Sequence, residues 1–427
     1  MTNSLTMETK EETESCLEPY RVLDLTQGGC LLCGKMLGDL GADVIIIESP
    51  GGNPSRCLGP FYKDIPDPEK SLFWFAFNSN KRGITLDIET IDGREILKSL
   101  VRTADFVIES FNPGYMDSLN IGYSALCEIN PKLIMASITP FGQHGPYAHY
   151  RASDLITMAM SGFMYLHGDP DRPPVWITFP QASIAGGAEC ASALMIAHWY
   201  RQTTGEGQYV DVSIRESVTN MLFNATVWWD IGKKNLVRSG DVWQIGSALI
   251  PFGYRCKDGY VSLNLLGGGR PSNVASSAAM VKWMDENGMA PEWLKSFDWV
   301  NEFDTTRVTQ ELVDNIVSAI ANFLLTKTKV EIMERALRDN IIVAPVNTAK
   351  DIWESPHHAH RNFFVQVEHP ELGVSLPYCG PFAKMSVTPV KMKRRPPLIG
   401  EHNVEVYEQE LGFKREDLLI LKQSRVI

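Results

Sequence analysis

The sequence predicts an α/β protein built on a parallel sheet, because strand and helix patterns alternate in its first half. Residues 20–25 (YRVLDL) have a strand pattern, a glycine turn and a helix follow to about Leu40, and residues 42–48 (ADVIIIE) form the next strand. A helix and a strand follow over 93–110. Further strands are expected at 132–139 and 209–214. Helices that alternate with strands in this order cover the faces of a parallel sheet.

The amino-acid pattern of the chain changes from about residue 225. Before that point, residues 185–200 (AGGAECASALMIAHWY) predict a helix packed closely at the centre, because small residues let a helix approach its neighbours. After it, tryptophans, short strands and the loop GGGRPSN indicate a smaller α/β domain, with helical sequence from 308 to 340. The expected division is a polar N-terminal extension (1–17), a large domain in two parts (18–224 and 336–427) and a small domain (225–335). A chain of 427 residues supports two domains.

Composition excludes several functional classes. A net charge of −11 argues against non-specific nucleic-acid binding, which needs basic surfaces. No apolar run approaches the ~18–20 residues that span a bilayer, and the first residues lack the apolar core of a secretory signal. Cys30 and Cys33 form a CxxC pair without a second pair or a nearby histidine, which favours buried free thiols. We therefore expect a cytoplasmic protein with no membrane contact.

Three local patterns could carry chemistry. The turn at Gln27, Gly28 and Gly29, with Glu48 closing the next strand, is reminiscent of a dinucleotide site, but the GxGxxG spacing is missing and a tight β–α turn is favoured. Asp154 follows Ser153 at a predicted helix start, where an aspartate usually caps the helix. His144 and His149 flank the preceding loop without carboxylates at ligand spacing, so no metal site is expected.

The run Gly267, Gly268 and Gly269, followed by Arg270 and Pro271, is the most informative loop. Three glycines give unusual backbone freedom at an entropic cost. Such loops act as lids or approach a ligand with their backbone, although a hairpin turn is the simpler alternative.

In order along the chain, several segments together resemble the family III CoA-transferases, which include formyl-CoA and carnitine CoA-transferases and α-methylacyl-CoA racemases. They are VLDLT, LGADVIIIESPGG, FNSNKRGITLDI, ADFVIESFNPG, INPKLIMASITPFGQHGP, TGEGQYVDVSI, APVNT and PPLIGEHNVEVYEQELGF. The resemblance runs from about Tyr20 to Phe413. It implies a Rossmann-like large domain with a smaller α/β domain, in chains that pair as an interlocked, ring-like dimer.

The family's reaction implies an aspartate nucleophile four residues before a glycine, and this chain departs from that pattern. Counting back from TGEGQ through the small-residue helix places Ser183 in the slot, with Gly187 four residues later. A serine would form an ester, from which acyl transfer to a thiol is uphill, and no strong base accompanies it in the sequence. The racemase branch has GHD where this chain has Ala152, Ser153 and Asp154, so racemase activity is not expected.

Basic residues that would hold CoA phosphates in the family are also replaced, by Ser49, Ser118 and Thr139. The resemblance leaves a reduced set of CoA-facing residues beside the glycine loop, namely Gln27, Asn80, Lys81, Arg82, Phe111 and Asn112.

We therefore expect the non-nucleophile subunit of a heteromeric CoA-transferase, whose homologous partner supplies the aspartate. CoA would move from an acyl-CoA, with succinyl-CoA favoured, to a carboxylic acid, with benzylsuccinate favoured. Acyl-CoA would be a substrate of the complex, and no permanently bound cofactor is expected. The alternatives are a self-sufficient homodimeric transferase, in which Asp154 is the nucleophile, and a non-enzymatic CoA-binding protein of this fold.

Overall fold

The structure, a computed structural model, describes residues 15–304 and 306–427. Most of the expected polar extension, residues 1–14, lies outside the described residues. The chain divides into two compact units. Unit 1 comprises the described residues up to Met164 together with Trp176–Asn235 and Ala359–Ile427, and unit 2 comprises Tyr165–Val175 and Leu236–His358. The domain boundaries expected from the sequence remain a prediction.

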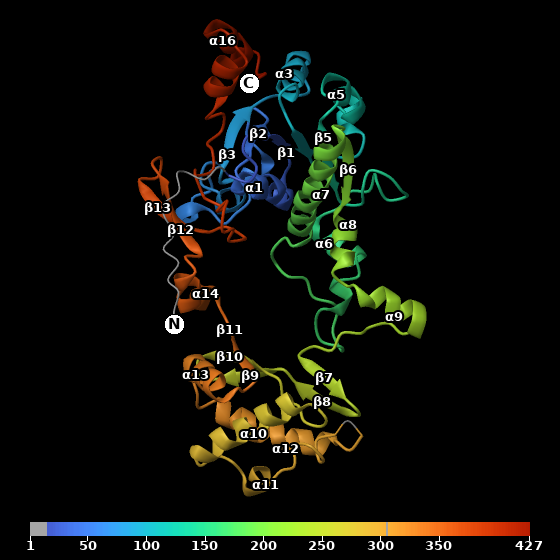
Figure 1. Cartoon of the computed structure of the whole chain (residues 1–427), viewed down its shortest axis with the longest axis vertical. Coiled ribbons are helices and arrows are strands. Elements are labelled where there is room, and N and C mark those ends of the chain that lie inside the picture. The colour runs from blue at the N-terminus through green and yellow to red at the C-terminus, as the bar shows by residue number, and fades with distance from the viewer. Residues whose placement is uncertain (1–14, 305) are drawn as a thin grey trace. The chain divides into compact units, whose positions relative to one another are not determined.

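Unit 1 contains a six-stranded parallel sheet, which confirms the expected α/β class (Figure 1). The strand order is β3-β2-β1-β4-β5-β6, with Leu23 of β1 level with Ile45 of β2 and Val107 of β4. This is the doubly wound order, in which the direction of winding reverses between β1 and β4. The strands are β1 (Arg21–Leu25), β2 (Asp43–Glu48), β3 (Lys81–Thr85), β4 (Phe106–Glu109), β5 (Ile134–Thr139) and β6 (Gln208–Ser213).

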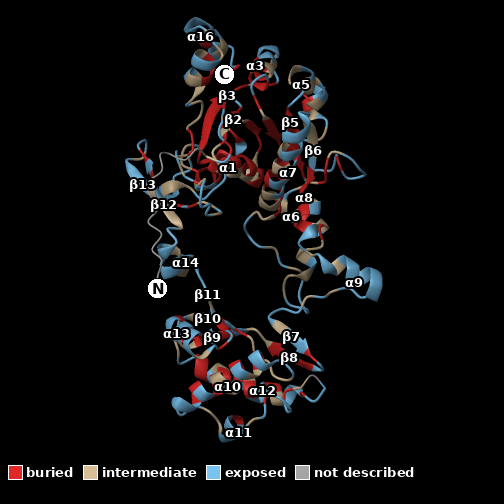
Figure 2. Ribbon diagram, in the orientation of Figure 1, coloured by how far each residue is buried: buried red, intermediate tan, exposed pale blue. Residues whose placement is uncertain are grey.

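Alternate strand residues cover the two faces of the sheet, and both faces are buried (Figure 2). Val22 and Val44 pack with side chains of α1 (Leu31–Asp39) and α7 (Ala182–Thr204). Their neighbours Leu23 and Ile45 pack with the opposite layer. That layer includes α3 (Ile91–Val101), α5 (Tyr123–Ile129) and α16 (Arg415–Gln423). Such two-sided burial explains the continuous apolar runs of these strands.

The other elements of unit 1 are short and mostly irregularly placed around the sheet. The α-helices are α2 (Leu72–Asn78), α4 (Tyr115–Ser118), α6 (Asp154–Met160), α8 (Ile214–Asn220) and α9 (Asn224–Gly232). The 3-10 helices are η1 (Gly28–Cys30), η2 (Pro54–Cys57), η3 (Tyr62–Asp64) and η4 (Met164–Leu166), and η5 (Val404–Glu410) is a π-helix. The hairpin is formed by β12 (Phe364–His369) and β13 (Val374–Cys379), and α15 (Pro356–His360) crosses the unit boundary in the sequence.

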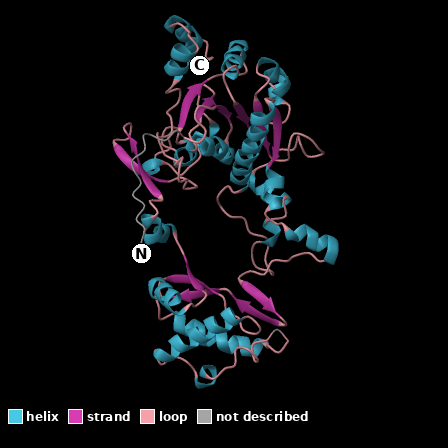
Figure 3. Ribbon diagram, viewed as in Figure 1, coloured by secondary structure: helices cyan, strands magenta, loops and turns pink. Residues whose placement is uncertain are grey.

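Unit 2 has an apolar core of its own, built from antiparallel strands and helices (Figure 3). Trp283 and Phe323 meet edge to face in this core, with ring centroids 4.8 Å apart. One sheet contains β9 (Gly253–Cys256), β10 (Gly259–Leu263) and β11 (Val343–Val346), and β7 (Val242–Ile245) pairs with β8 (Ala248–Pro251). The helices are α10 (Pro271–Glu286), α11 (Glu292–Lys295), α12 (Gln310–Leu324), α13 (Lys329–Asp339) and α14 (Ala349–Trp353).

Candidate functional site

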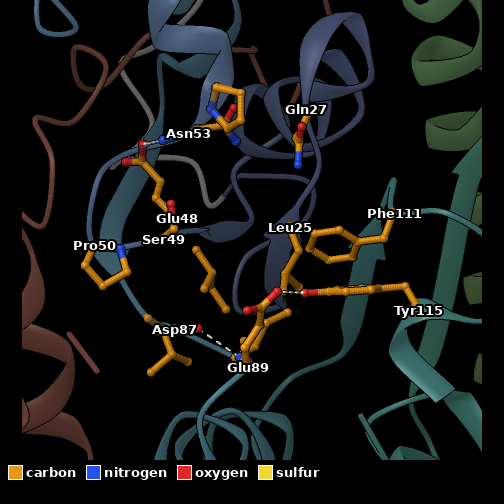
Figure 4. A pocket seen from close by; sticks show the side chains of 14 residues that line it. Leu25, Gln27, Glu48, Ser49, Pro50, Asn53, Asp87, Glu89, Phe111 and Tyr115 are labelled. Carbon is orange, nitrogen blue, oxygen red and sulfur yellow. Dashed lines mark hydrogen bonds between the residues drawn. The ribbon is translucent and has the colours of Figure 1, made fainter. Parts of the chain in front are cut away.

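A pocket of about 350 Å³ opens at the carboxyl ends of β1, β2 and β3 and beside the loop that follows β4 (Figure 4). Leu25, Ile47 and Leu86 give it apolar walls. Phe111 and Tyr115 add two aromatic rings, whose centroids are 4.9 Å apart. Ligands of open α/β sheets bind in this crevice, where the strand order reverses. We call it the sheet-edge pocket.

Carboxylates dominate the charge of the sheet-edge pocket. Glu48 ends β2 and is held by buried Arg56, whose Nε and Nη2 donate to it at 2.6 and 2.8 Å. Asp87 and Glu89 follow β3, and Glu89 accepts a hydrogen bond of 2.9 Å from the Tyr115 hydroxyl. Among the described residues, no Lys or Arg lines this pocket. A phosphate that entered it would therefore meet the carboxylates of Asp87 and Glu89, to which no cation of the described lining is paired.

The structure brings two of the six expected CoA-facing residues to the sheet-edge pocket. Gln27 and Phe111 line it, and the Gln27 side chain points into it (Figure 4). Asn112 lines a second pocket of about 200 Å³ that also contains Glu109 and Ser137.

Asn80, Lys81 and Arg82 lie at the amino end of β3, away from that pocket. The ammonium group of Lys81 is buried, 2.8 Å from Asp24, and also donates to the carbonyl of Leu31. Arg82 pairs with Asp43, Glu405 and Glu410. Asn80 donates to Asp39 and to the backbone carbonyl of Lys391. The structure thus gives all three side chains partners within the protein.

Ser183 is the second residue of α7, and its position depends on a close approach between α7 and the turn after β1. A Cβ atom added to Gly29 would lie 2.4 Å from the Ser183 hydroxyl oxygen, so only glycine fits there. Gly187 makes the matching approach one turn later, because a Cβ atom added to it would lie 3.0 Å from the carbonyl oxygen of Gly29. Within the described residues, the Ser183 hydroxyl has no hydrogen-bond partner that could serve as its base.

Asp154 does not cap its own helix: Ser153 precedes α6, and Asp154 is the first helical residue. Its carboxylate instead caps α7. Oδ1 accepts from the amides of Ala182 at 2.8 Å and Ser183 at 3.3 Å, and Oδ2 accepts from Gln181 and Trp176. A carboxylate at a helix N-terminus satisfies free amides and favours the helix dipole. Asp154 therefore holds the start of α7, where Ser183 lies.

Glu109, which the sequence analysis passed over, is the most strongly perturbed acid at this edge of the sheet. Burial raises its pKa to about 7, and Asp117 and Asp211 add to the rise. Ser137 and the amide of Phe111 bind its carboxylate and partly oppose the shift. The sequence signal was an acid that ends the apolar strand FVIE. Acids with such raised pKa values occur at functional sites.

The residues that replace the family's basic groups lie in different surroundings. Ser49 is exposed and lines the sheet-edge pocket. Ser118 is exposed and donates to the carbonyl of Tyr115, and Thr139 is buried.

The described histidines and cysteines form neither a metal cluster nor a reactive thiol pair. Over the described ranges, no group of three His, Cys, Asp or Glu side chains could hold a metal ion. Cys30 and Cys33 are buried free thiols, and burial raises the pKa of Cys30 to about 12. A thiol with this pKa is unreactive at neutral pH.

The glycine loop lies in unit 2, between β10 and α10. Gly268 has a positive φ of 72°, and its amide donates to the carbonyl of Trp299. Gly267 is packed against Trp299 and Phe303 so tightly that a side chain would clash.

The chain belongs to CoA-transferase family III, whose family model matches residues 17–403. The chain is 34% identical to the succinyl-CoA:(R)-benzylsuccinate CoA-transferase subunit BbsE of Thauera aromatica, over 91% of this chain and 92% of that one. It is 32% identical to the formyl-CoA:oxalate CoA-transferase of Streptomyces coelicolor, over 97% of this chain and all of that one. The predicted family is therefore confirmed.

A solved structure agrees with this assignment. The crystal structure of a CAIB/BAIF family protein from Brucella suis superposes with a TM-score of 0.80 at 28% identity, covering 93% of this chain and 99% of that one. In the part of the chain that the structure describes, no helix is long and apolar enough to cross a membrane.

Proposed function

We propose that this chain is the non-nucleophile subunit of a heteromeric CoA-transferase, in which a homologous partner supplies the catalytic aspartate. The observation that carries the proposal is the surroundings of Ser183 at the start of α7, where no described residue accepts a hydrogen bond from its hydroxyl as a base would. The similarity to a relative whose name marks it as one subunit of an enzyme supports it. An interlocked dimer with the partner is part of the proposal.

The chemistry explains why a serine does not serve in this position. In the family's reaction a carboxylate attacks the thioester, which gives a mixed anhydride and free CoA thiolate. The thiolate then attacks the enzyme's acyl carbonyl, and an aspartyl-CoA thioester forms as the donor acid leaves. A serine ester is lower in energy than a thioester, so the return of the acyl group to CoA would be unfavourable. Activation of the hydroxyl would also require a neighbouring base.

Asp154 is a poor candidate for the missing nucleophile, because its carboxylate already accepts four hydrogen bonds. To attack a thioester it would have to release the amides at the start of α7, which are then left without a partner. A self-sufficient enzyme that uses Asp154 is the alternative that the experiment below must separate.

Within the complex, we propose succinyl-CoA as the donor and benzylsuccinate as the acceptor. The relatives named for succinyl-CoA chemistry support this choice. Carboxylates line the sheet-edge pocket and would repel the phosphates of CoA. They therefore favour a role in which the partner carries CoA and this chain assists it.

The test combines this chain with a homologous chain that carries aspartate in the nucleophile slot. CoA transfer from succinyl-CoA to benzylsuccinate is measured for each chain alone and for the mixture. We expect activity in the mixture, unchanged by Ser183→Ala in this chain and abolished when the partner's aspartate is replaced. Full activity from this chain alone, lost on Asp154→Asn, would overturn the proposal in favour of the self-sufficient enzyme.

A further inference from the structure

The pocket of about 200 Å³ that contains Glu109 is separate from the sheet-edge pocket. The two pockets share the turn that follows β4, but they have no lining residue in common. The walls of the smaller pocket come from β4, β5, β6, the start of α5 and the loop after β5. Tyr123 and Tyr209 give it two aromatic rings, whose centroids are 5.5 Å apart. We call it the Glu109 pocket.

One wall of the Glu109 pocket has a hydrogen-bond donor without an acceptor. Gln143, in the loop after β5, lines the pocket, and its side-chain nitrogen is buried with no hydrogen-bond partner among the described residues. A buried amide nitrogen without an acceptor is uncommon, because the loss of its water is not compensated. A ligand with an acceptor oxygen would compensate this loss.

Two carboxylates beside the same pocket set the opposite requirement. Asp117 lines the pocket, and Asp211 accepts from the backbone amide of Gln143 at 2.9 and 3.0 Å. Burial is the main cause of the raised pKa of Glu109, and these two acids add to it. Among the described residues, neither Lys nor Arg lines the pocket. An anionic ligand would therefore be repelled, whereas a ligand with hydrogen-bond donors would be favoured.

We propose that the Glu109 pocket binds the primary carboxamide group of a small neutral molecule with an aromatic body. The carbonyl oxygen of a carboxamide accepts from the Gln143 side chain, and its NH2 group donates to an acid such as Asp117. A carboxylate has no donor and carries the disfavoured charge, whereas an amidinium has no acceptor. Tyr123 and Tyr209 pack against the aromatic body. The site is separate from the nucleophile slot and does not depend on the proposed subunit role.

The experiment measures equilibrium binding to the purified full-length chain by calorimetry, so no transfer reaction is involved. The probe is benzamide. Its comparators are benzoate and benzamidine, which have the same planar shape but carry a negative and a positive charge at neutral pH. We expect saturable binding of benzamide, with each comparator weaker by about fivefold or more, the effect of one lost hydrogen bond or one repelled charge.

Two variants test the assigned residues against a matched control. Gln143→Leu removes the unpaired donor and keeps a side chain of similar size, so it should weaken the binding of benzamide about fivefold. Asp117→Asn removes one negative charge and should raise the affinity for benzoate about fivefold relative to benzamide. Gln366→Leu changes an exposed glutamine of β12 outside the pocket and should leave binding unchanged.

Several outcomes would overturn the proposal. Without saturable binding of benzamide, the pocket would hold water alone. Tighter binding of benzamidine than of benzamide would make it a cation site, and tighter binding of benzoate would make it an anion site. Equal effects of Gln143→Leu and Gln366→Leu would place the ligand elsewhere. If Gln143→Leu does not fold, the selectivity of the parent chain and of Asp117→Asn still decides, and none of these results bears on CoA transfer.

Discussion

The two edges of the parallel sheet differ in how far their charged side chains are paired with opposite charges. At the amino edge, the charged residues that begin β3 are paired inside the protein, Lys81 with Asp24 and Arg82 with Asp43, Glu405 and Glu410. At the carboxyl edge, Glu48 is paired with Arg56, but Asp87, Glu89 and Glu109 face pockets and have no ion pair with any described residue. The amino edge therefore uses charge to hold the fold, whereas the carboxyl edge leaves charge available to a ligand or a proton.

The comparison suggests a second role for the segment NKR, and its CoA-facing role stays a prediction. By resemblance, Asn80, Lys81 and Arg82 face CoA, but their contacts are those of residues that join β3 to β1, α1 and the C-terminal segment. Four substitutions test whether charged residues stabilise the fold at one edge and are available to a ligand at the other. They follow in order of decreasing expected effect.

Lys81→Met should destabilise the protein most, by about 3–5 kcal/mol, because it leaves the buried Asp24 carboxylate without its cation. Burial already lowers the pKa of Lys81, and Asp24 opposes that shift. The free energy of unfolding in urea measures the effect. Lys98→Met, which removes the partner of exposed Glu95, is the control and should cost less than about 1 kcal/mol. Normal stability with lost CoA binding would instead favour the CoA-facing role.

Glu109 should make stability depend on pH. Its pKa rises from 4.5 in the unfolded chain to about 7 in the fold, so the folded protein holds the proton more tightly. This contribution is complete below pH 4.5 and is lost as the pH rises through 7, by roughly 3 kcal/mol in total. Glu109→Gln should remove it, so the stability difference between variant and parent should change between pH 5 and pH 8. A pH-independent difference would show that the carboxyl group is not desolvated.

Asp154→Ala should destabilise by about 1–2 kcal/mol, because the first amides of α7 lose their acceptor. Asp154→Asn keeps an acceptor oxygen without the charge and should recover about half of the loss. Thermal unfolding of both variants measures the effect. If Asp154→Ala leaves stability unchanged but removes CoA transfer by this chain alone, Asp154 is the nucleophile and not a cap.

The sheet was predictable from the sequence because its strands are buried on both sides and therefore appear as uninterrupted apolar runs, as in ADVIIIE. β3 was the exception. Its sequence KRGIT begins with two charged residues, and their burial depends on acids distant in the sequence, such as Asp24 and Glu410. Pairing between distant residues leaves no local pattern, so this strand could not be predicted.

The candidate site, like the sheet, was predictable from the sequence only where a local pattern indicates it. Gln27 and Phe111 directly follow strands, and the geometry of a parallel sheet brings such residues to one edge. Counting from neighbouring motifs put Ser183 ahead of the small-residue helix, and its assignment to the nucleophile slot stays a prediction. The capping of α7 by Asp154 could not, because the two segments are joined by a long irregular stretch.

Glu89→Gln should have the smallest effect, an increase of about two- to fivefold in the affinity of the purified chain for CoA. Glu89 lines the sheet-edge pocket, and its charge would repel the phosphates of the nucleotide. Glutamine keeps an oxygen to accept from the Tyr115 hydroxyl, so the wall should retain its shape. Calorimetric titration with CoA measures the change, and Glu128→Gln on the exposed face of α5 is the control. A weaker affinity for CoA after Glu89→Gln would mean that the carboxylate binds a hydroxyl group of the ligand. The carboxyl edge would then be a nucleotide site in its own right, and the chain would have more than a supporting role.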